Sequence, residues 1–220
     1  MSKTSPRTTR SCSNYYPLPA RQRIPLWLKL AHSAFLCVLV PVYWGHYGPA
    51  NFLWGSDIAL FLVLASLWLE APLPNSMMAI GVLPFEILWC ADLMSGARLL
   101  GVTGYMFDVD RALLLRVLSL FHLVLPVLII FLLRRLGYDP RALMAQSLLT
   151  WAVLPLTYLL TAPSDNVNLV FGLGRYPQTL LPGPLYLALL MIALPLLVYW
   201  PLDRALGRLC RRRQAAGTQP

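Results

Sequence analysis

The sequence has 220 residues, of which 58% are hydrophobic and 12% are charged. That composition excludes an ordinary soluble domain and is typical of an integral membrane protein. The formal net charge of +9 does not indicate a nucleic-acid-binding protein, because the basic residues stand at the two ends of the chain and in one short loop.

The four cysteines, Cys12, Cys37, Cys90 and Cys210, have neither a CxxC spacing nor a cysteine–histidine spacing typical of zinc sites. Two of them, Cys37 and Cys90, lie inside apolar runs. We therefore expect no disulfide framework, no metal site and no cofactor.

The chain begins with a polar, basic segment, residues 1–23, which we expect to be a disordered cytoplasmic tail. No small-residue cleavage pattern follows the first apolar run, so we expect that run to be retained as a helix. Residues 24–206 are predicted to form a transmembrane domain, and residues 207–220 a second basic, disordered tail.

Six apolar runs in this domain are long enough to cross a bilayer as helices. They are predicted at about residues 26–44, 52–69, 76–94, 111–133, 142–161 and 185–206. Glycine, proline and polar residues fill the connections between the runs. These include a glycine-rich loop or interfacial segment at residues 95–110 and a proline-rich connector at residues 162–184, which cannot be a spanning helix.

Positive charge predicts the orientation, because Lys and Arg are retained on the cytoplasmic side of a membrane. With both termini inside, the two basic tails and the loop that holds Arg134, Arg135 and Arg141 all lie in the cytoplasm. The sequence therefore predicts an all-α, polytopic bundle of six transmembrane helices in the cell (inner) membrane, surrounded by membrane lipid, with both termini cytoplasmic.

The fourth predicted span carries Arg116, Ser119 and His122 inside an apolar run. An ionisable group within a membrane helix is costly, which makes it a candidate for function. Pro126 lies four residues after His122 and removes the helical partner of the His122 carbonyl. This turn is therefore predicted to hold a kink and a site.

The other ionisable groups fall at a similar depth in the membrane once the predicted spans are placed across it. Asp57, Glu86 and Arg116 are predicted in the outer half of the bundle, with His122 near the midplane. This distribution predicts a polar cavity that opens outwards between the second to fifth spans. A structural alternative remains open, in which Asp57, Glu86 and Arg116 form a buried ion-pair network and His122 is an ordinary core histidine.

Several motifs resemble those of a group of bacterial integral membrane proteins called membrane-associated proteins. They are YGPANFLWGSDIAL, GYMFD, SLFHLVLP, RLGYD and the Asn166-Val-Asn168 turn. This resemblance runs from Trp27 to Pro201 and implies no particular activity.

FLWGSDIAL, HLVLP and the Asn-x-Asn loop followed by GPLY are also remotely similar to the androgen-induced and transmembrane acyltransferase-like superfamily of membrane enzymes that act on lipid esters. This resemblance implies that His122 is the general base. Trp54 stands where the androgen-induced branch has a threonine, so Ser56 or a water activated by His122 would be the nucleophile.

These observations lead to three functional hypotheses. In the first, the protein is a hydrolase or acyltransferase for a lipid-like ester, in which Asp57 or Glu86 orients His122 and Ser56 or water attacks the ester. The substrate and its oxyanion would be held by residues of the fourth and fifth spans and the following loop: Arg116, Asn166, Asn168 and Tyr158. In the second, Asp57 and Glu86 bind a cation, a proton or a small amphiphile. In the third, the polar groups only hold the helices together.

Overall fold

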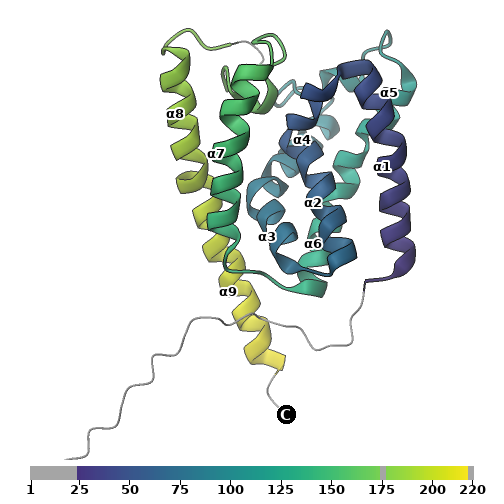
Figure 1. The fold of residues 1–220 in the computed structure, drawn as a ribbon, viewed down its shortest axis with the longest axis vertical. Helices are drawn as coiled ribbons and strands as arrows, with labels where there is room; N and C mark the ends of the chain where they lie inside the picture. The colour runs from purple at the N-terminus through teal and green to yellow at the C-terminus, as the bar shows by residue number, and fades with distance from the viewer. Residues whose placement is uncertain (1–23, 174–176, 218–220) are drawn as a thin grey trace, which may run out of the picture.

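The computed structural model describes residues 24–173 and 177–217, and every regular element within them is helical. The predicted tail at residues 1–23 lies outside the described residues. The expectation of an all-α chain is therefore confirmed for the described part (Figure 1).

The α-helices are α1 (Leu26–Tyr47), α2 (Gly55–Leu69), α3 (Pro72–Gly81), α4 (Leu83–Met94), α5 (Leu113–Ser119), α6 (Phe121–Leu136), α7 (Ala142–Leu160), α8 (Gly183–Ala193) and α9 (Trp200–Gly217). Short 3-10 helices occur at η1 (Pro49–Leu53), η2 (Gly104–Met106) and η3 (Val167–Leu169), and a π-helical stretch, η4 (Leu194–Tyr199), joins α8 to α9. The sequence predicts that the last span ends at residue 206, but α9 continues to Gly217.

Four helical stretches are long and apolar enough to cross a membrane: Leu26–Tyr47, Leu113–Leu136, Ala142–Leu160 and Gly183–Cys210. The bent pair of α3 and α4 forms a fifth candidate, with an angle of 51° between its halves. The predicted span at residues 52–69 is shorter in the structure, because α2 has 15 residues and follows η1. At about 1.5 Å per residue, α2 is roughly 22 Å long, less than a typical hydrocarbon core.

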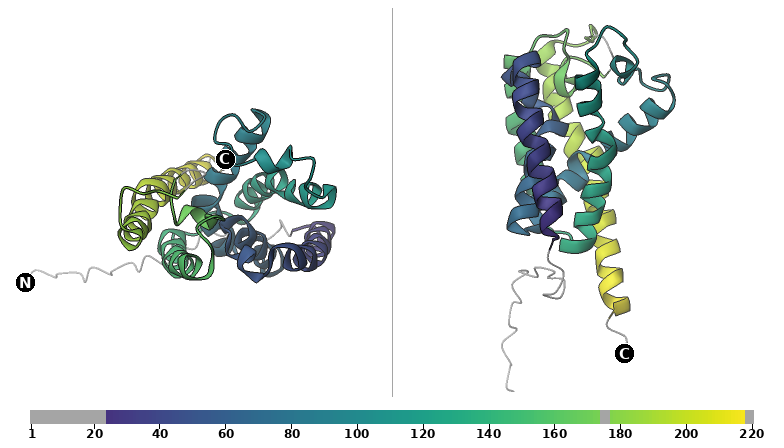
Figure 2. Two further views of the ribbon diagram at one scale, coloured as in Figure 1. Left: turned by 90° about the horizontal axis from the view of Figure 1, so that it is seen from above. Right: turned by 90° about the vertical axis from the view of Figure 1, so that its right-hand side faces the viewer.

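The break between α3 and α4 has a simple covalent cause. Pro84 has no backbone N–H, so the carbonyl of Ile80 cannot receive its usual helical hydrogen bond. At Gly81 a Cβ atom would lie 2.2 Å from Nε2 of Gln146 in α7, so only glycine allows this close approach. Figure 2 shows α4 leaning away from the rest of the bundle above this point. The third predicted span, residues 76–94, is therefore two half-helices rather than one.

Prolines inside the helices free carbonyls that accept side-chain donors from neighbouring helices. Pro126 frees the carbonyl of His122, which accepts a hydrogen bond from Sγ of Cys90 at 3.3 Å. Pro195 frees the carbonyl of Met191, and Nε1 of Trp151 donates to it at 2.8 Å. The chain thus replaces two lost backbone hydrogen bonds with contacts between helices.

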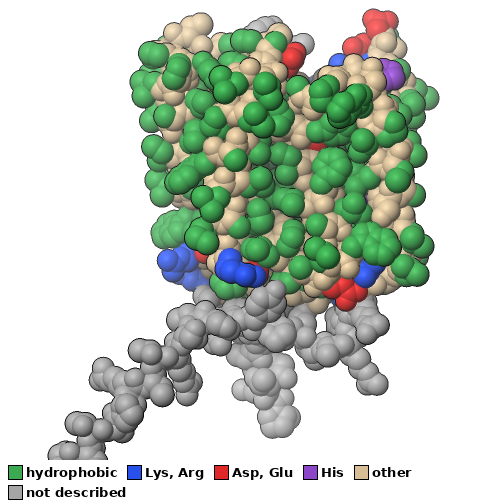
Figure 3. Space-filling model, in the orientation of Figure 1, with side chains coloured by type: hydrophobic (Ala, Val, Ile, Leu, Met, Phe, Trp, Pro, Cys, Tyr) green, Lys and Arg blue, Asp and Glu red, His purple; other side chains and the backbone are tan. Residues whose placement is uncertain are grey.

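The half-helix α3 lies at the centre of the bundle, packed against α2, α6 and α7. All residues from Asn75 to Gly81 are buried. The core around them includes Val63 and Leu67 of α2 and Ile129 and Leu132 of α6. Large hydrophobic side chains also cover much of the outside, as the space-filling view shows (Figure 3). Such a surface is suited to contact with lipid tails rather than water.

The helices have two distinct ends. The start of α1, the end of α6 and the start of α7 lie at the end from which α9 leaves the bundle, where Lys and Arg side chains gather; we call it the basic end (Figures 1 and 3). These segments and α9 carry Lys29, Arg134, Arg141 and Arg204. The connections at residues 48–54 and 95–112, and the described parts of a third at residues 161–173 and 177–182, lie at the other end, which we call the loop end.

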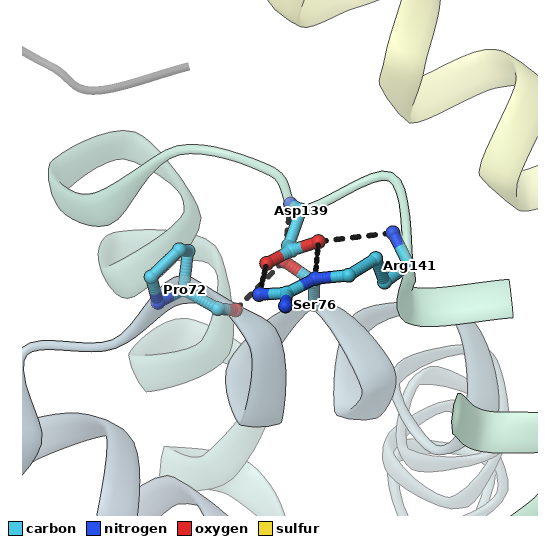
Figure 4. A network of polar contacts seen from close by, with 4 residues as sticks. All are labelled: Pro72, Ser76, Asp139 and Arg141. Atoms are coloured by element: carbon cyan, nitrogen blue, oxygen red, sulfur yellow. Dashed lines mark hydrogen bonds and ion pairs between the residues drawn. The ribbon is translucent and has the colours of Figure 1, made fainter. Parts of the chain in front are cut away.

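The connection at the basic end between α6 and α7 is tied to the start of α3 (Figure 4). The backbone N–H of Asp139 donates to Oγ of Ser76 at 3.0 Å, and Ser76 in turn donates to the carbonyl of Pro72. The Arg141 side chain donates to both carboxylate oxygens of Asp139, at 3.0 and 2.7 Å. These contacts hold α3 in register with the helices that surround it.

Candidate functional site

Buried Glu86 and half-buried His122 form a hydrogen-bonded pair between α4 and α6. Oε2 of Glu86 lies 2.7 Å from Nδ1 of His122, and the side chains are 4% and 13% exposed. The carboxylate selects the tautomer in which Nδ1 carries the proton, so Nε2 is left as a potential base. Within the described part of the chain Nε2 of His122 makes no hydrogen bond.

Two aromatic rings hold the imidazole in place. The ring of Trp89 stacks on it at 4.3 Å between centroids and 20° between planes, and the ring of Phe121 stacks at 4.1 Å and 24°. Two nearly parallel rings at such distances can only occupy opposite faces of the imidazole. The hydrogen bond to Glu86 therefore fixes the rotation of the imidazole within its plane, and the two stacked rings prevent its movement perpendicular to that plane.

Asp57 is the third ionisable residue of the site. It is 3% exposed, on the first turn of α2, and interacts electrostatically with Glu86. Its Oδ2 atom accepts a hydrogen bond from Nδ2 of Asn51 at 3.2 Å. Its Oδ1 atom is buried and has no hydrogen-bond partner among the residues that the structure describes. The predicted trio of Asp57, Glu86 and His122 thus lies together, but only Glu86 bonds directly to the imidazole.

Cys90 is part of this site although the sequence interpretation does not include it among the candidates. Its thiol donates to the backbone carbonyl of His122, as described above. The signal available in the sequence is its position four residues after Glu86, which places the two side chains on the same face of α4. The proline four residues after His122 is the second half of that signal.

Ser56 and Arg116 have weaker connections to the pair. Ser56 is half-buried beside Asp57, and no hydrogen bond joins it to His122 among the described residues. Nη1 of Arg116 reaches the carbonyl of Met106 at 3.5 Å, and its Nε is buried without a partner. In the described part of the chain no ion pair joins Arg116 to a carboxylate, so the network considered above is not formed there.

The Asn-x-Asn turn is bound to the start of α2. Oδ1 of Asn168 accepts from the backbone N–H of Gly55 at 2.9 Å, while its Nδ2 donates to the carbonyl of Leu53 at 2.7 Å. Asn166 folds its own loop, since its side chain bonds to the backbone of Phe171 and Gly172. Both asparagines have a positive φ, a conformation that asparagine tolerates well.

Tyr158 packs at the top of α7, away from these polar contacts. Its ring stacks on Phe171 at 5.0 Å, and its hydroxyl lies where a Cβ of Gly183 would be. Asn166, Asn168 and Tyr158 therefore link the connector at residues 161–182 to α2, α7 and α8. In the described part of the chain, no hydrogen bond joins any of these three residues to His122.

The connection at residues 95–112 is held close to the same site. Asp92, at the end of α4, accepts hydrogen bonds from the backbone N–H groups of Leu100, Gly101 and Thr103 and from the Thr103 hydroxyl. Further along, the Tyr105 hydroxyl interacts with the side chains of Ser119 and Trp89, and burial raises its pKa. The connection thus reaches the ring that stacks on His122.

A shallow surface depression lies at the basic end, far from this chemistry. It is lined by Ile24, Leu26, Lys29, Trp68, Leu69 and Glu70. Its charged groups are already engaged, since Nζ of Lys29 lies 2.7 Å from Oε1 of Glu70. We take Glu86, His122 and Asp57 as the candidate site because they combine burial, an oriented base and, at Oδ1 of Asp57, a carboxylate oxygen without a hydrogen-bond partner among the described residues.

No protein-family model, curated protein or solved structure matches this chain. The functional argument therefore depends on the side chains described above.

Proposed function

We propose that the protein is a six-span inner-membrane enzyme, with both termini cytoplasmic, that hydrolyses or transfers the acyl group of a lipid-like ester. In this topology the loop end faces outwards, and the bent pair α3–α4 and the short α2 each count as one span. The basic residues at the opposite end support that orientation. The remote similarity to membrane enzymes that act on lipid esters is part of the same proposal.

The observation that carries the proposal is the 2.7 Å hydrogen bond between Glu86 and His122. A carboxylate that binds Nδ1 orients the imidazole and stabilises the imidazolium that forms when Nε2 takes a proton. The stacked rings of Trp89 and Phe121 keep Nε2 in a single direction. A buried histidine that only filled space would need neither constraint.

In the proposed reaction His122 activates a water molecule. Nε2 takes a proton from the water as its oxygen bonds to the ester carbonyl carbon, giving a tetrahedral oxyanion. The C–O bond to the alcohol then breaks, and the imidazolium returns its proton to the leaving alkoxide. The products are a carboxylic acid and an alcohol. Water is the better candidate nucleophile here, because no hydrogen bond joins Ser56 to His122 in the described chain.

Arg116 is the candidate for stabilising the oxyanion. Its buried Nε–H has no acceptor, and its guanidinium has no carboxylate partner among the described residues. A donor that is already in place and cationic would stabilise negative charge developing on the ester oxygen. The amide of Asn168 is less suited to this role, because its Nδ2 already donates to Leu53.

The experiment is an assay of the full chain, purified and reconstituted in lipid nanodiscs, against lipid esters that differ in headgroup, with product release followed by mass spectrometry. His122→Ala should lower turnover by about 100-fold or more, the usual contribution of a general base. His46→Ala is the matched control, since His46 is exposed and bonds only within α1. Turnover by His122→Ala equal to that of the parent protein would remove the enzyme hypothesis.

A second candidate function is the binding of a cation, a proton or a small amphiphile, and one observation favours it. Oδ1 of Asp57 is a buried carboxylate oxygen without a partner, beside a second carboxylate. The polar side chains of Gln146, Thr150 and Tyr199 also lie together inside the bundle, with the Thr150 and Tyr199 hydroxyls 2.9 Å apart. The two functions separate experimentally, because ligand binding would survive His122→Ala.

A further inference from the structure

Asp57 has fewer hydrogen bonds than an ionised carboxylate needs. Within residues 24–173 and 177–217, its Oδ2 atom has the single hydrogen bond from Asn51, and its Oδ1 atom has none. Asp92 illustrates the contrast, since its carboxylate accepts four hydrogen bonds from the connection at residues 95–112. Asp57 is 3% exposed and Asp92 is 0% exposed, so bulk water has little access to either residue.

The groups around Asp57 do not neutralise a negative charge. Glu86 of α4 is a carboxylate and repels it, and the Tyr43 hydroxyl of α1 is within electrostatic range. His122 of α6 directs Nδ1 to Glu86, and η1 contributes the neutral amide of Asn51. The buried polar side chains of α3, Asn75 and Ser76, are neutral and bond to Ile129 and to Asp139 rather than to Asp57.

The remaining titratable groups that face α2 already bond to residues other than Asp57. On α1, Nε2 of His32 bonds to the carbonyl of Leu60, and Lys29 pairs with Glu70 at the far end of α2. The ion pairs in the described part of the chain involve Lys29, His122 and Arg141, and none includes Asp57.

These contacts favour the neutral acid over the carboxylate. An unpaired carboxylate held away from water costs far more than a neutral polar group. A carboxylic acid whose O–H lacks an acceptor costs only about 1–3 kcal/mol. Glu86 already bonds to His122, so a proton on Asp57 avoids placing a second negative charge beside that carboxylate.

We propose that Asp57 is a proton-binding site, with the exchangeable proton on Oδ1 and Oδ2 held by Asn51. This inference names the ligand of the second candidate function and rests on that function, not on ester chemistry. The occupied site is an uncharged carboxylic acid beside the Glu86–His122 pair. A polar group that reaches Oδ1 can accept this proton.

Dicyclohexylcarbodiimide, an apolar reagent, tests this directly. The acid transfers its proton to a carbodiimide nitrogen and its oxygen adds to the central carbon, and the adduct rearranges to an N-acylurea. Nothing leaves, so the protein gains the full mass of the reagent. The reaction requires a protonated carboxyl in an apolar environment, so an ionised or salt-bridged carboxylate does not react in this way.

The full chain in detergent is treated across mildly acidic to mildly alkaline pH, digested and mapped by mass spectrometry. We expect an adduct on Asp57 that decreases as the pH rises, none on Glu86, and none at position 57 in Asp57→Asn. Absence of the adduct from Asp57 throughout, or its appearance on Glu86 instead, would overturn the proposal. Protection by sodium chloride but not by choline chloride would also overturn it, because the ligand would then be a metal cation.

A pair of neutral variants gives an independent measurement. Asparagine resembles the protonated acid in shape and charge, so Asp57→Asn should keep the Tm within about 2 °C of the parent. Glu86→Gln is the matched comparison, since it removes the carboxylate that binds Nδ1 of His122 and should lower the Tm by more. A larger loss of Tm for Asp57→Asn than for Glu86→Gln would mean that position 57 requires a carboxylate, contrary to the proposal. Neither measurement depends on turnover, so a failed ester assay leaves both interpretable.

Discussion

The thiol of Cys90 donates a hydrogen bond to the backbone carbonyl of His122, which Pro126 deprives of its usual partner. This contact joins α4 to α6 one helical turn from the Glu86–His122 hydrogen bond. The proline and the cysteine therefore act together. Pro126 removes a backbone hydrogen bond within α6, and Cys90 replaces it with a hydrogen bond from α4.

Replacing Cys90 by alanine should leave the His122 carbonyl unpaired and lower the free energy of unfolding by about 1 kcal/mol. Cys90→Ser retains a donor and should lie closer to the parent protein. To measure the difference, the variants are heated in detergent and the folded fraction that remains is quantified by size-exclusion chromatography. Equal losses for the alanine and serine variants would mean that the hydrogen bond contributes nothing. Cys37→Ala is the control, because Cys37 is exposed on α1.

Gly81→Ala should destabilise the bundle, because its new Cβ would meet Cγ, Cδ and Nε2 of Gln146 within 2.8 Å. The expected loss is about 1–3 kcal/mol, the usual cost of overpacking. Gly45→Ala is the matched control: nothing lies within 4 Å of its Cβ position, so its effect should be neutral or slightly stabilising.

Shortening Gln146 tests the cause of that loss. In the double variant Gly81→Ala with Gln146→Ala, the clash is removed, and the two effects should not add. A loss equal to the sum of the single-variant losses would locate the strain elsewhere in the α3–α4 break.

Asp139 should give the protein an acid-sensitive contribution to its stability. Burial raises the pKa of this carboxyl, but the hydrogen bonds and charge of Arg141 together outweigh burial and hold the pKa below its ordinary value. A depressed folded-state pKa stabilises the fold above the unfolded value of about 3.9, and that contribution is lost as the pH falls through the lower folded value.

Asp139→Asn should accordingly cost about 1 kcal/mol at neutral pH, with Arg141 largely exposed to solvent. The gap in Tm between variant and parent should stay constant down to about pH 5 and close on further acidification. Asp110→Asn is the control, because Asp110 is exposed. A gap that grows as the pH falls would contradict the assigned direction of the shift.

Asn168→Ala should loosen the start of α2, because the backbone N–H of Gly55 and the carbonyl of Leu53 both lose a partner. We expect a loss of about 1–3 kcal/mol and faster amide exchange at Gly55. Asn168→Asp keeps the acceptor for Gly55 but not the donor to Leu53, so its amide exchange should be intermediate. Unchanged exchange at Gly55 in both variants would show that the turn does not hold α2.

Hydrophobic patterning predicts the helical class and the general course of the chain, because long apolar runs bounded by glycine and proline leave few alternatives. The patterning does not reveal the break at Gly81, since the residues on both sides are equally apolar. Gly81 and Pro84 are the only local signs of it. The start of α2 is equally hidden, because Phe52, Leu53 and Trp54 directly before it are apolar.

Residues of the site are harder to predict than the helices. Depth along each helix brings Asp57, Glu86 and His122 to similar levels, but depth alone cannot tell which carboxylate bonds to the imidazole. That choice depends on helix rotation and on the tilt of α4. The contact of Asn168 with Gly55 spans 113 residues in sequence. Neither periodicity nor spacing carries information over such a separation.

Asp92 ties the connection at residues 95–103 to the same helix that carries Glu86. The turn and the Glu86 carboxylate are therefore both carried by α4, beyond the bend at Gly81 and Pro84. An antibody fragment that recognises the Asp92-bound turn would report on the position of the half-helix that carries Glu86, without any probe entering the bundle.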